Sequence, residues 1–433
     1  MRPPAWEPRD PKRHIHLTFS SDLNFCLNYI RLKKASWSLN SFFSVSYKNP
    51  TSALATCFRE GAEPKEIRIF KMDQGGENPA SFTSALSLTQ MGVSRVPRRY
   101  ILPPLQRNSY LDQLLPADPL PMLDLAALRQ PSQRSIIVRD LGRACRDLGF
   151  FQVINHGISP LVTQSALGAA SEFFDLPVQD KMVHFSDDIN APVRYGTSVN
   201  HKNDQVHFWR DFLKHYAHPL SNWINSWPSK PPEYRNKMSK YAREVRELSK
   251  ELMGAIFESL GLEGDYLRDE MEEGSQVMAV NCYPPCPEPE LALGMPPHSD
   301  YSCLTILVQD RQGLQIKEEK SNKWISVPAT QGALLVHVGD HLEVLSNGRY
   351  KSVVHRATVD PESRRLSIAS FHTLSMQKKV RPAEELVDKQ HPIKYKESSF
   401  ADFLQFLSAT DITQLGRKYI DTLRVLDHHD DIN

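Results

Sequence analysis

Two histidines and one aspartate in the second half of the chain have the types and spacing of a metal site. His298 and Asp300 lie two residues apart, so in an extended segment both side chains project to the same side and can reach one ion. His355 lies in the apolar run 353–357, where strand alternation can turn it toward the same interior. Two imidazoles and one carboxylate leave further positions of an octahedral ion open, which is a ligand set suited to non-haem Fe(II).

The alternative is that both histidines are ordinary structural residues, because a single His-x-Asp motif is common. The next apolar run favours the metal site. It begins ten residues after His355, and alternation places Arg365, Ser367 and Phe371 on one face. A guanidinium in a protein interior requires an anion, and its planar fork fits a carboxylate through two parallel hydrogen bonds. A dicarboxylic 2-oxo acid satisfies both sites, with one end on the metal and the other on Arg365.

The connection between His355 and Arg365 carries a geometric expectation. We expect the two strands to pair as an antiparallel hairpin with both side chains pointing inward. Directly opposed residues then have equal parity, so without a bulge the loop 360–364 must hold an odd number of residues.

Three other histidines of this half could complete a metal site instead. We expect His341, after a Gly-Asp turn, at the surface or beside the ligands, His337 in a packing layer, and His372 at the edge of a substrate cavity. His355 is preferred because it alone combines an apolar strand with an arginine ten residues later.

Short strands must position these side chains. After Gly274 the chain consists of β-rich runs separated by turn signals such as Asn347-Gly348, without intervening helices. This pattern predicts a sandwich or barrel. The predicted strands are 277–283, 304–309, 314–317, 324–327, 333–338, 352–359 and 365–371.

The preceding segment mixes helices with strand. Apolar residues recur at helical spacing between Ile137 and Leu148, Gly149 can end that helix in a left-handed cap, and the run 150–157 predicts a buried strand. A long helix with an apolar stripe from Met238 to Leu260 follows. A last helix is expected after Ser399.

With these motifs in place, the sequence resembles the plant 2-oxoglutarate- and Fe(II)-dependent dioxygenases, in particular the flavanone 3-hydroxylase-like and downy-mildew-resistance-type branch. The resemblance runs from about residue 96 to residue 403. The stretches that carry it, besides the motif around His298, are Leu148–Gly157, Asn281–Pro287, Leu304–Asp310 and Gly339–Gly348.

The resemblance implies a role for each matching residue. The implied iron ligands are His298, Asp300 and His355. The implied contacts of 2-oxoglutarate are Arg365 and Ser367, on its distal carboxylate, with Tyr283 and Asn281. The implied reaction consumes O2 and 2-oxoglutarate, releases succinate and CO2, and hydroxylates or desaturates a small substrate, with ascorbate keeping the iron reduced.

The substrate implied by the resemblance is an aromatic plant metabolite, a flavonoid or another phenolic. Tyr301 stands where flavanone hydroxylases usually have Pro, and a phenol next to the ligating Asp300 changes the cavity wall, which argues against flavanone itself. The expected wall residues, which in the alternative interpretation are core aromatics, are Tyr195, Phe208, Tyr301 and Phe371.

Other functions remain to be weighed against this one. The same chemistry could act on a hormone-type acid such as salicylate or a gibberellin. A metal hydrolase with the same ligands would leave Arg365 unexplained and has no visible nucleophile. A catalytically silent metal-binding protein of the same fold would have no requirement for the three ligands and the arginine together.

We therefore expect a mixed α/β (α+β) fold, a double-stranded β-helix (jelly roll) flanked by helices, with a helical and mixed amino-terminal domain. Residues 1–71 hold twelve Lys and Arg against six Asp and Glu and show no periodicity, so little packed structure is expected there unless the natural chain begins at Met72. The predicted parts are an extension 1–71, an entry segment 72–118, an amino-terminal domain 119–265, a catalytic jelly roll 272–375 and a helical segment 376–433.

Composition limits the partners. Across 433 residues, 52 Lys and Arg balance 51 Asp and Glu, so no excess charge attracts nucleic acid or anionic lipid. No apolar stretch approaches the ~20 residues that span a bilayer. The six cysteines, including Cys282 and Cys286, lack the paired spacing of a zinc site and predict buried or reduced thiols, hence a cytoplasmic protein. We expect a monomer that binds small molecules and O2.

Overall fold

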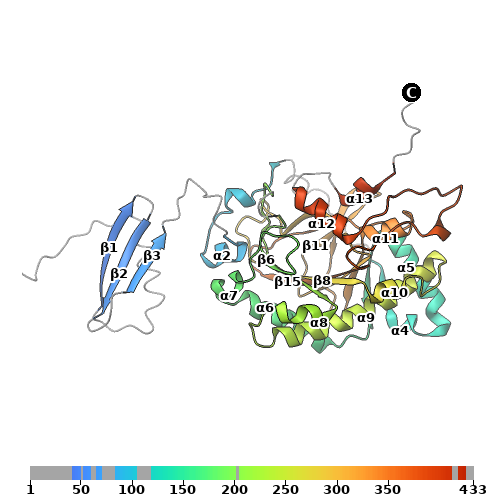
Figure 1. Cartoon of the computed structure of the whole chain (residues 1–433), viewed down its shortest axis with the longest axis horizontal. Helices are drawn as coiled ribbons and strands as arrows, with labels where there is room; N and C mark the ends of the chain where they lie inside the picture. The colour runs from blue at the N-terminus through green and yellow to red at the C-terminus, as the bar shows by residue number, and fades with distance from the viewer. Residues whose placement is uncertain are drawn as a thin grey trace, which may run out of the picture. The chain divides into compact units, whose positions relative to one another are not determined.

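Figure 1 shows a computed structural model of the chain, which divides into two units, Met1–Phe82 and Thr83–Asn433. The structure describes residues 41–49, 52–59, 65–70, 83–104, 119–200, 204–411 and 418–425. In the first unit, an antiparallel sheet that the sequence did not predict consists of β1 (Ser41–Asn49), β2 (Ser52–Arg59) and β3 (Lys65–Phe70). The rest of the predicted extension 1–71, and much of the entry segment 72–118, lie outside the described residues.

The second unit is built on two sheets that form the expected jelly roll. The larger sheet has the strand order β4-β5-β13-β10-β15-β8-β7-β6, and the smaller has the order β12-β11-β14-β9. The strands are β4 (Met122–Asp124), β5 (Phe150–Ile154), β6 (Val193–Gly196), β7 (Asp211–His218), β8 (Ser275–Tyr283), β9 (Met295–His298), β10 (Leu304–Gln309), β11 (Leu314–Glu318), β12 (Lys323–Val327), β13 (Leu334–Val338), β14 (His355–Ala357) and β15 (Arg365–Thr373).

The predicted hairpin between His355 and Arg365 is wrong. β14 pairs with β11 and β9 in the smaller sheet, whereas β15 pairs with β10 and β8 in the larger one. Both side chains nevertheless line the same cavity between the sheets. The parity rule for the connecting loop does not apply, since it holds only for strands that pair directly.

Helices occupy the remainder of the second unit (Figure 1). They are α2 (Ala85–Gln90), α4 (Leu125–Leu128), α5 (Pro131–Asp147), α6 (Pro160–Phe174), α7 (Val178–Met182), α8 (Leu220–Trp223), α9 (Tyr234–Leu260), α10 (Arg268–Glu272), α11 (Asp340–Leu345), α12 (Phe400–Ala409) and α13 (Tyr419–Leu423), with 3-10 turns η2 (Arg98–Tyr100), η3 (Ile224–Ser226) and η4 (Glu384–Leu386). None of the described helices is both long enough and apolar enough to cross a membrane.

Helices α5, α6 and α9 pack together, and α6 and α9 contact β15 of the larger sheet. The apolar stripe predicted for α9 is buried, from Met238 through Leu252 to Leu260. Each such Leu or Ile stabilises the packing by about 1.5–3 kcal/mol through removal of apolar surface from water. The helix therefore supports the back of the sheet that carries Arg365.

The end of α5 follows the sequence prediction. Gly149 adopts φ +65°, in the left-handed region, and its N–H donates to the Ala144 carbonyl. A Cβ at this position would lie 2.1 Å from the Lys351 carbonyl oxygen, so only glycine fits. The next residue, Phe150, begins β5 and is fully buried.

Apolar side chains from both sheets fill part of the space between them. This core includes Ile316, Ile325 and Val327 of the smaller sheet with Leu335 and Ala369 of the larger. The rest of the space is a cavity of ≈ 250 Å³. The side chains that could bind a metal or an anion, including His298, Asp300, His355 and Arg365, line that cavity.

Candidate active site

The two predicted histidines and Asp300 meet in the cavity. His298, at the end of β9, is the direct cross-strand partner of His355, at the start of β14, and their ring centroids are 4.2 Å apart. Oδ1 of Asp300 lies 3.7 Å from Nε2 of His298 and 3.6 Å from Nε2 of His355. Nitrogen and oxygen ligands lie about 2.0–2.2 Å from an ion such as Zn²⁺, so these separations let Asp300 share one ion with each histidine.

The backbone orients both imidazoles toward the same point. Nδ1 of His298 lies 2.8 Å from the Pro296 carbonyl oxygen, and Nδ1 of His355 lies 3.2 Å from the Val353 carbonyl oxygen. A carbonyl can only accept, so in each ring Nδ1 carries the proton and Nε2 keeps its lone pair. Metal-binding histidines are commonly held in this way.

The charges of the group also suit a metal. Burial alone would raise the pKa of Asp300, but His355, His337 and His298 outweigh it and hold that pKa below its ordinary value. Burial lowers the pKa of His298, and burial together with the His298 ring lowers that of His355. The aspartate is therefore ionised and the imidazoles neutral, which are the forms that bind metal ions.

The predicted co-substrate residues form two cross-strand pairs beside this group. Arg365 is opposite Tyr283, and Ser367 is opposite Asn281, on β15 and β8. The Arg365 guanidinium lies 4.8 Å from the centre of the Tyr283 ring. The four side chains thus share one patch of the larger sheet.

Not all hydrogen-bond donors of Arg365 have a partner. Its Nη2 donates to Oε1 of Gln309 at 2.7 Å and its Nε to the Arg311 carbonyl at 3.1 Å, and both acceptors are neutral. Nη1 of Arg365 and Oγ of Ser367 are buried without a hydrogen-bond partner, which is rare for polar atoms in folded proteins. No Asp or Glu in the described part of the chain forms an ion pair with this arginine. A carboxylate fits this position in charge and in hydrogen-bonding capacity.

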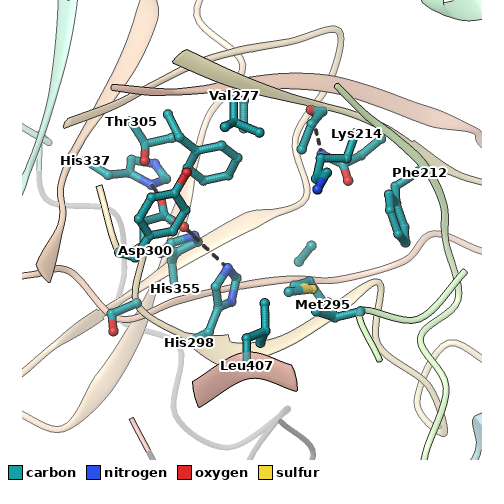
Figure 2. Close-up of a pocket in the computed structure, with 18 of the residues that line it drawn as sticks. Phe212, Lys214, Val277, Met295, His298, Asp300, Thr305, His337, His355 and Leu407 are labelled. Atoms are coloured by element: carbon teal, nitrogen blue, oxygen red, sulfur yellow. Dashed lines mark hydrogen bonds and ion pairs between the residues drawn. The ribbon is translucent and has the colours of Figure 1, made fainter. Parts of the chain in front are cut away.

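Figure 2 shows His298, Asp300 and His355 converging at one side of the cavity, with Phe212 and Lys214 on the other side. Phe212 and Lys214 belong to β7, which with β6 was not predicted from the sequence. The signal that could have found them is the alternation of Arg210, Phe212 and Lys214, which places three cavity residues on one face.

Aromatic rings form a further wall. The ring of Tyr301 stacks on Phe400 at 4.5 Å and on Phe403 at 4.4 Å between centroids, and lies 5.8 Å from Phe371. Phe400 and Phe403 belong to α12, so this helix closes part of the cavity. We refer to these four rings as the aromatic wall.

Two of the four predicted substrate contacts therefore line the cavity, Tyr301 and Phe371. Tyr195 and Phe208 do not line this cavity. Tyr195 is on the opposite face of β6 from Arg194, and its hydroxyl donates to Asp211. Phe208 precedes β7 and is buried outside the cavity lining.

The three other histidines that could have completed the metal site, His337, His341 and His372, do not belong to the His298, Asp300 and His355 group. His337 lines the cavity, with Nδ1 3.5 Å from Oδ2 of Asp300, so it flanks the candidate ligand Asp300 rather than only packing. His341 is buried rather than at the surface, with Nδ1 2.7 Å from Oγ1 of Thr373. His372 lies on the opposite face of β15 from Phe371 and does not edge the cavity. Cys282 and Cys286 are buried free thiols, as predicted.

Comparison with known proteins identifies two family models that match this chain. Residues 274–374 match the 2OG-Fe(II) oxygenase superfamily, and residues 120–230 match the family described as non-haem dioxygenase in morphine synthesis N-terminal. The first match contains His298, Asp300, His355 and Arg365.

Individual relatives agree with this match. The chain is 49% identical over 315 residues to flavanone 3-dioxygenase 3 of Oryza sativa subsp. japonica, covering 72% of this chain and 95% of the relative. It is 38% identical to protein DOWNY MILDEW RESISTANCE 6 of Arabidopsis thaliana, covering 74% and 93%. The crystal structure of JOX2 in complex with 2OG, Fe and JA is 31% identical, with a TM-score of 0.71, covering 80% of this chain and 99% of that one.

Proposed function

The chain belongs to the 2OG-Fe(II) oxygenase superfamily, and from this premise we propose that it oxidises a C–H bond of a small aromatic plant metabolite, a flavonoid or another phenolic. The family implies Fe(II) as cofactor and 2-oxoglutarate and O2 as co-substrates. The observation that carries the proposal is the presence, in one cavity, of a His-Asp-His group and an arginine with an unsatisfied buried donor. Ascorbate, as the reductant that keeps the iron ferrous, is part of the proposal.

The metal and its co-substrate supply chemistry that no side chain of this protein has: when bound, they couple loss of CO2 from 2-oxoglutarate to reduction of O2 and oxidation of the substrate. For a hydroxylation the balance is one C–H bond, one 2-oxoglutarate and one O2, giving one C–OH, one succinate and one CO2. A desaturation gives a C=C bond and water in place of the C–OH.

The protein's own residues hold and orient these components. His298, Asp300 and His355 would hold the iron through two Nε2 atoms and a carboxylate oxygen. Arg365 and Ser367 would receive the distal carboxylate of 2-oxoglutarate, for which Nη1 and Oγ are available. Tyr283 and Asn281, their cross-strand partners, would line the path of the co-substrate toward the metal.

His337 has a supporting part in this proposal. Its Nδ1 faces the second carboxylate oxygen of Asp300 at 3.5 Å, while Oδ1 faces both ligand histidines. A donor at that position fixes the carboxylate so that Oδ1 is directed at the metal.

The aromatic wall supports the substrate class. Stacked rings favour a planar aromatic ligand, and closely packed apolar rings limit water in the cavity. The name of the flavanone 3-dioxygenase relative is consistent with a flavonoid, although Tyr301 beside Asp300 argues against flavanone itself. We also propose a monomer in the cytoplasm.

The proposed function is tested with purified protein, metal analysis and succinate release. We expect one iron per chain and 2-oxoglutarate decarboxylation that is stimulated by members of a flavonoid and phenolic panel. Stimulation by aliphatic acids but by no phenolic would refute the aromatic substrate class. Absence of both iron binding and 2-oxoglutarate decarboxylation would refute the assigned roles of the ligands and Arg365.

A further inference from the structure

A second group of cations lines the cavity on β6 and β7. Arg194 of β6 is the direct cross-strand partner of Lys214 of β7. Arg210, just before β7, shares a face with Phe212 and Lys214. All of these side chains line the same cavity as His298 and Arg365. We refer to Arg194, Arg210 and Lys214 as the cationic wall.

The cationic wall is held by neutral groups. Arg194 donates from Nε to the Ser186 carbonyl at 2.7 Å and from Nη1 to the Val199 carbonyl at 2.6 Å. Lys214 donates to the Ile189 carbonyl at 2.8 Å. In the described part of the chain, neither side chain forms an ion pair with an Asp or Glu.

Arg210 repeats this pattern. It is buried, its Nη1 donates to Oδ1 of Asn281 at 2.9 Å, and its Nε has no partner. The guanidinium carbons of Arg210 and Arg194 lie 5.0 and 5.3 Å from the centre of the Phe212 ring. The two arginines thus flank one aromatic ring, and no carboxylate is bonded to either.

This arrangement is costly without an anion. Like charges directly opposite on an antiparallel pair are destabilising, and buried charges are normally paired. Burial lowers the pKa of Arg194 to about 10, although Asp187, Asp204 and Asp188 act to raise it. Burial with the repulsion of Arg194 lowers the pKa of Lys214 to about 7, although Asp188 acts to raise it. These carboxylates therefore do not offset the burial of the two cations. A negatively charged group between them would offset both effects.

Arg194 and Lys214 of the cationic wall are separate from the Arg365 site, whereas Arg210 bonds to Asn281 beside that site. In the larger sheet, β15 is followed by β8, β7 and β6, so Arg365 and Arg194 lie three strands apart. At about 4.8 Å per strand this is ~14 Å across the sheet. One 2-oxoglutarate that extends from Arg365 to the metal does not also reach Arg194. Arg194 and Lys214 are therefore available to a different anion, with Arg210 between the two sites.

The cationic wall also adjoins the aromatic wall. Lys214 lies 5.0 Å from the centre of the Tyr216 ring. Tyr216 and Ile189, whose carbonyl accepts from Lys214, belong to the same apolar cluster as Tyr301 and Phe400. One ligand can therefore contact rings at one end and cations at the other.

We propose that Arg194 and Lys214, with Arg210 beside them, bind an anionic oxygen of the primary substrate, carried on an aromatic ring that packs against the aromatic wall. The proposal rests on the proposed function and narrows its substrate class to aromatic anions. Two sources share this chemistry, an aromatic carboxylate and an ionised phenol such as the acidic hydroxyl of a flavonoid.

Binding of matched probes tests the proposal. The full chain is loaded with Fe(II) and 2-oxoglutarate without O2 and titrated by calorimetry. One arm compares 4-hydroxybenzoate with its methyl ester at pH 6, where Lys214 is charged because its pKa is about 7. The other arm compares a hydroxyflavanone, at a pH where its phenol is ionised, with the O-methylated compound. In this second arm Arg194 and Arg210 supply the charge, so Lys214→Met is read in the first arm. In at least one arm we expect the anion to bind about tenfold more tightly or better, as one charge-assisted hydrogen bond would give.

Substitutions then locate the preference. Lys214→Met and Arg194→Gln should each reduce the preference to about threefold or less, while the affinities for the neutral probe, for iron and for 2-oxoglutarate stay within about twofold. Lys214→Arg should retain the preference because it keeps the charge. Lys240→Met, an exposed position on α9, is the matched control and should behave as the wild type.

Equal binding of anionic and neutral probes to the wild-type protein in both arms overturns the proposal, whatever the variants do. It is also overturned if Lys214→Met and Arg194→Gln, shown to be folded by their melting curves, weaken 2-oxoglutarate rather than the anionic probe. Failure of the proposed function is a different result. In that case the wild-type protein lacks iron-dependent 2-oxoglutarate decarboxylation, whether or not it prefers the anionic probe.

Discussion

The cavity has two walls that carry cations, and they differ in what surrounds the charge. Arg365 lies on β15, in the middle of the larger sheet, with a serine two residues on and a tyrosine opposite. Arg194 lies on β6, the edge strand of the same sheet, and Lys214 lies opposite it on the neighbouring strand β7, beside apolar rings. The first site suits a small carboxylate of fixed length, and the second suits an anion attached to a flat apolar body.

The two walls also differ in how readily their side chains can be substituted. A central strand is held on both sides by hydrogen bonds, so its side chains are fixed relative to the metal ligands. The edge strands and α12 border the rest of the cavity, where changes of side chain disturb fewer neighbours. We infer that the metal and co-substrate side sets the reaction and that the edge side selects the substrate.

The largest effect is expected from His355→Ala. This change removes one of three ligands, so we expect loss of iron binding and of turnover. Metal content after dialysis and succinate release measure both. Binding of an aromatic probe to the cationic and aromatic walls should persist. His391→Ala, an exposed histidine paired with Asp388, is the control and should retain iron. Full iron occupancy in His355→Ala would contradict the assignment of His355 as an iron ligand.

Arg365→Ala should leave iron bound and raise the 2-oxoglutarate requirement. Truncating one partner of a buried charge pair costs about 2–5 kcal/mol, hence a rise of about thirtyfold or more. Steady-state kinetics with varied 2-oxoglutarate measure this rise. Arg311→Ala is the control, because its backbone carbonyl, which accepts from Arg365, remains. Equal loss of iron in Arg365→Ala and His355→Ala would contradict the division of roles.

Phe403→Leu tests the aromatic wall with a smaller change. Phe403 stacks on Tyr301, and a leucine keeps the apolar character but loses the ring. Aromatic pairs contribute about 0.5–1.5 kcal/mol beyond their buried area, so an aromatic carboxylate should bind about two- to tenfold more weakly. Cyclohexanecarboxylate should bind about as before. A rise in the 2-oxoglutarate requirement of the same size would show that the wall serves the co-substrate as well.

The smallest effect is a pH dependence at the edge side. Burial, reinforced by Arg194 and partly offset by Asp188, lowers the pKa of Lys214 to about 7. The charged and titratable groups that face it are Arg194 on β6, Asp188 in the preceding loop and Tyr216 on β7. Because the folded pKa is lowered, the ammonium is present below about pH 7 and is lost above it.

Affinity for an aromatic carboxylate, which stays ionised, should therefore fall about three- to fivefold from pH 6 to pH 8. Titration calorimetry at several pH values measures it. Lys214→Arg should show a flat profile, since arginine keeps its charge throughout. The same slope in that variant would assign the titration to another group.

The sequence predicted the reaction side of the cavity far better than the edge side. The predicted strand 365–371 lies within β15, so the inward direction of Arg365 and Ser367 could be read from the two-residue period of a strand. The pairing of the strands could not be predicted in the same way. One of the two partners of β14 is β9, whose Pro296 and Pro297 argue against a strand and are tolerated because β9 is an edge strand.

The edge side depends on contacts between distant segments. Arg194 and Lys214 become neighbours only through the register of β6 on β7, and Phe403 meets Tyr301 only when α12 folds back over the cavity. Tyr195 illustrates the difficulty, because one step along the strand reverses its direction and moves it from the cavity to Asp211. Residue type alone could not distinguish it from Arg194.

The most direct measurement is a crystal structure of the protein grown without O2 in the presence of Fe(II), 2-oxoglutarate and an aromatic carboxylate. We predict iron bonded to Nε2 of His298, Nε2 of His355 and Asp300, the distal carboxylate of 2-oxoglutarate on Arg365, and the aromatic carboxylate on Arg194 and Lys214. Iron bound elsewhere, or the distal carboxylate of 2-oxoglutarate on Arg194 and Lys214, would contradict the account.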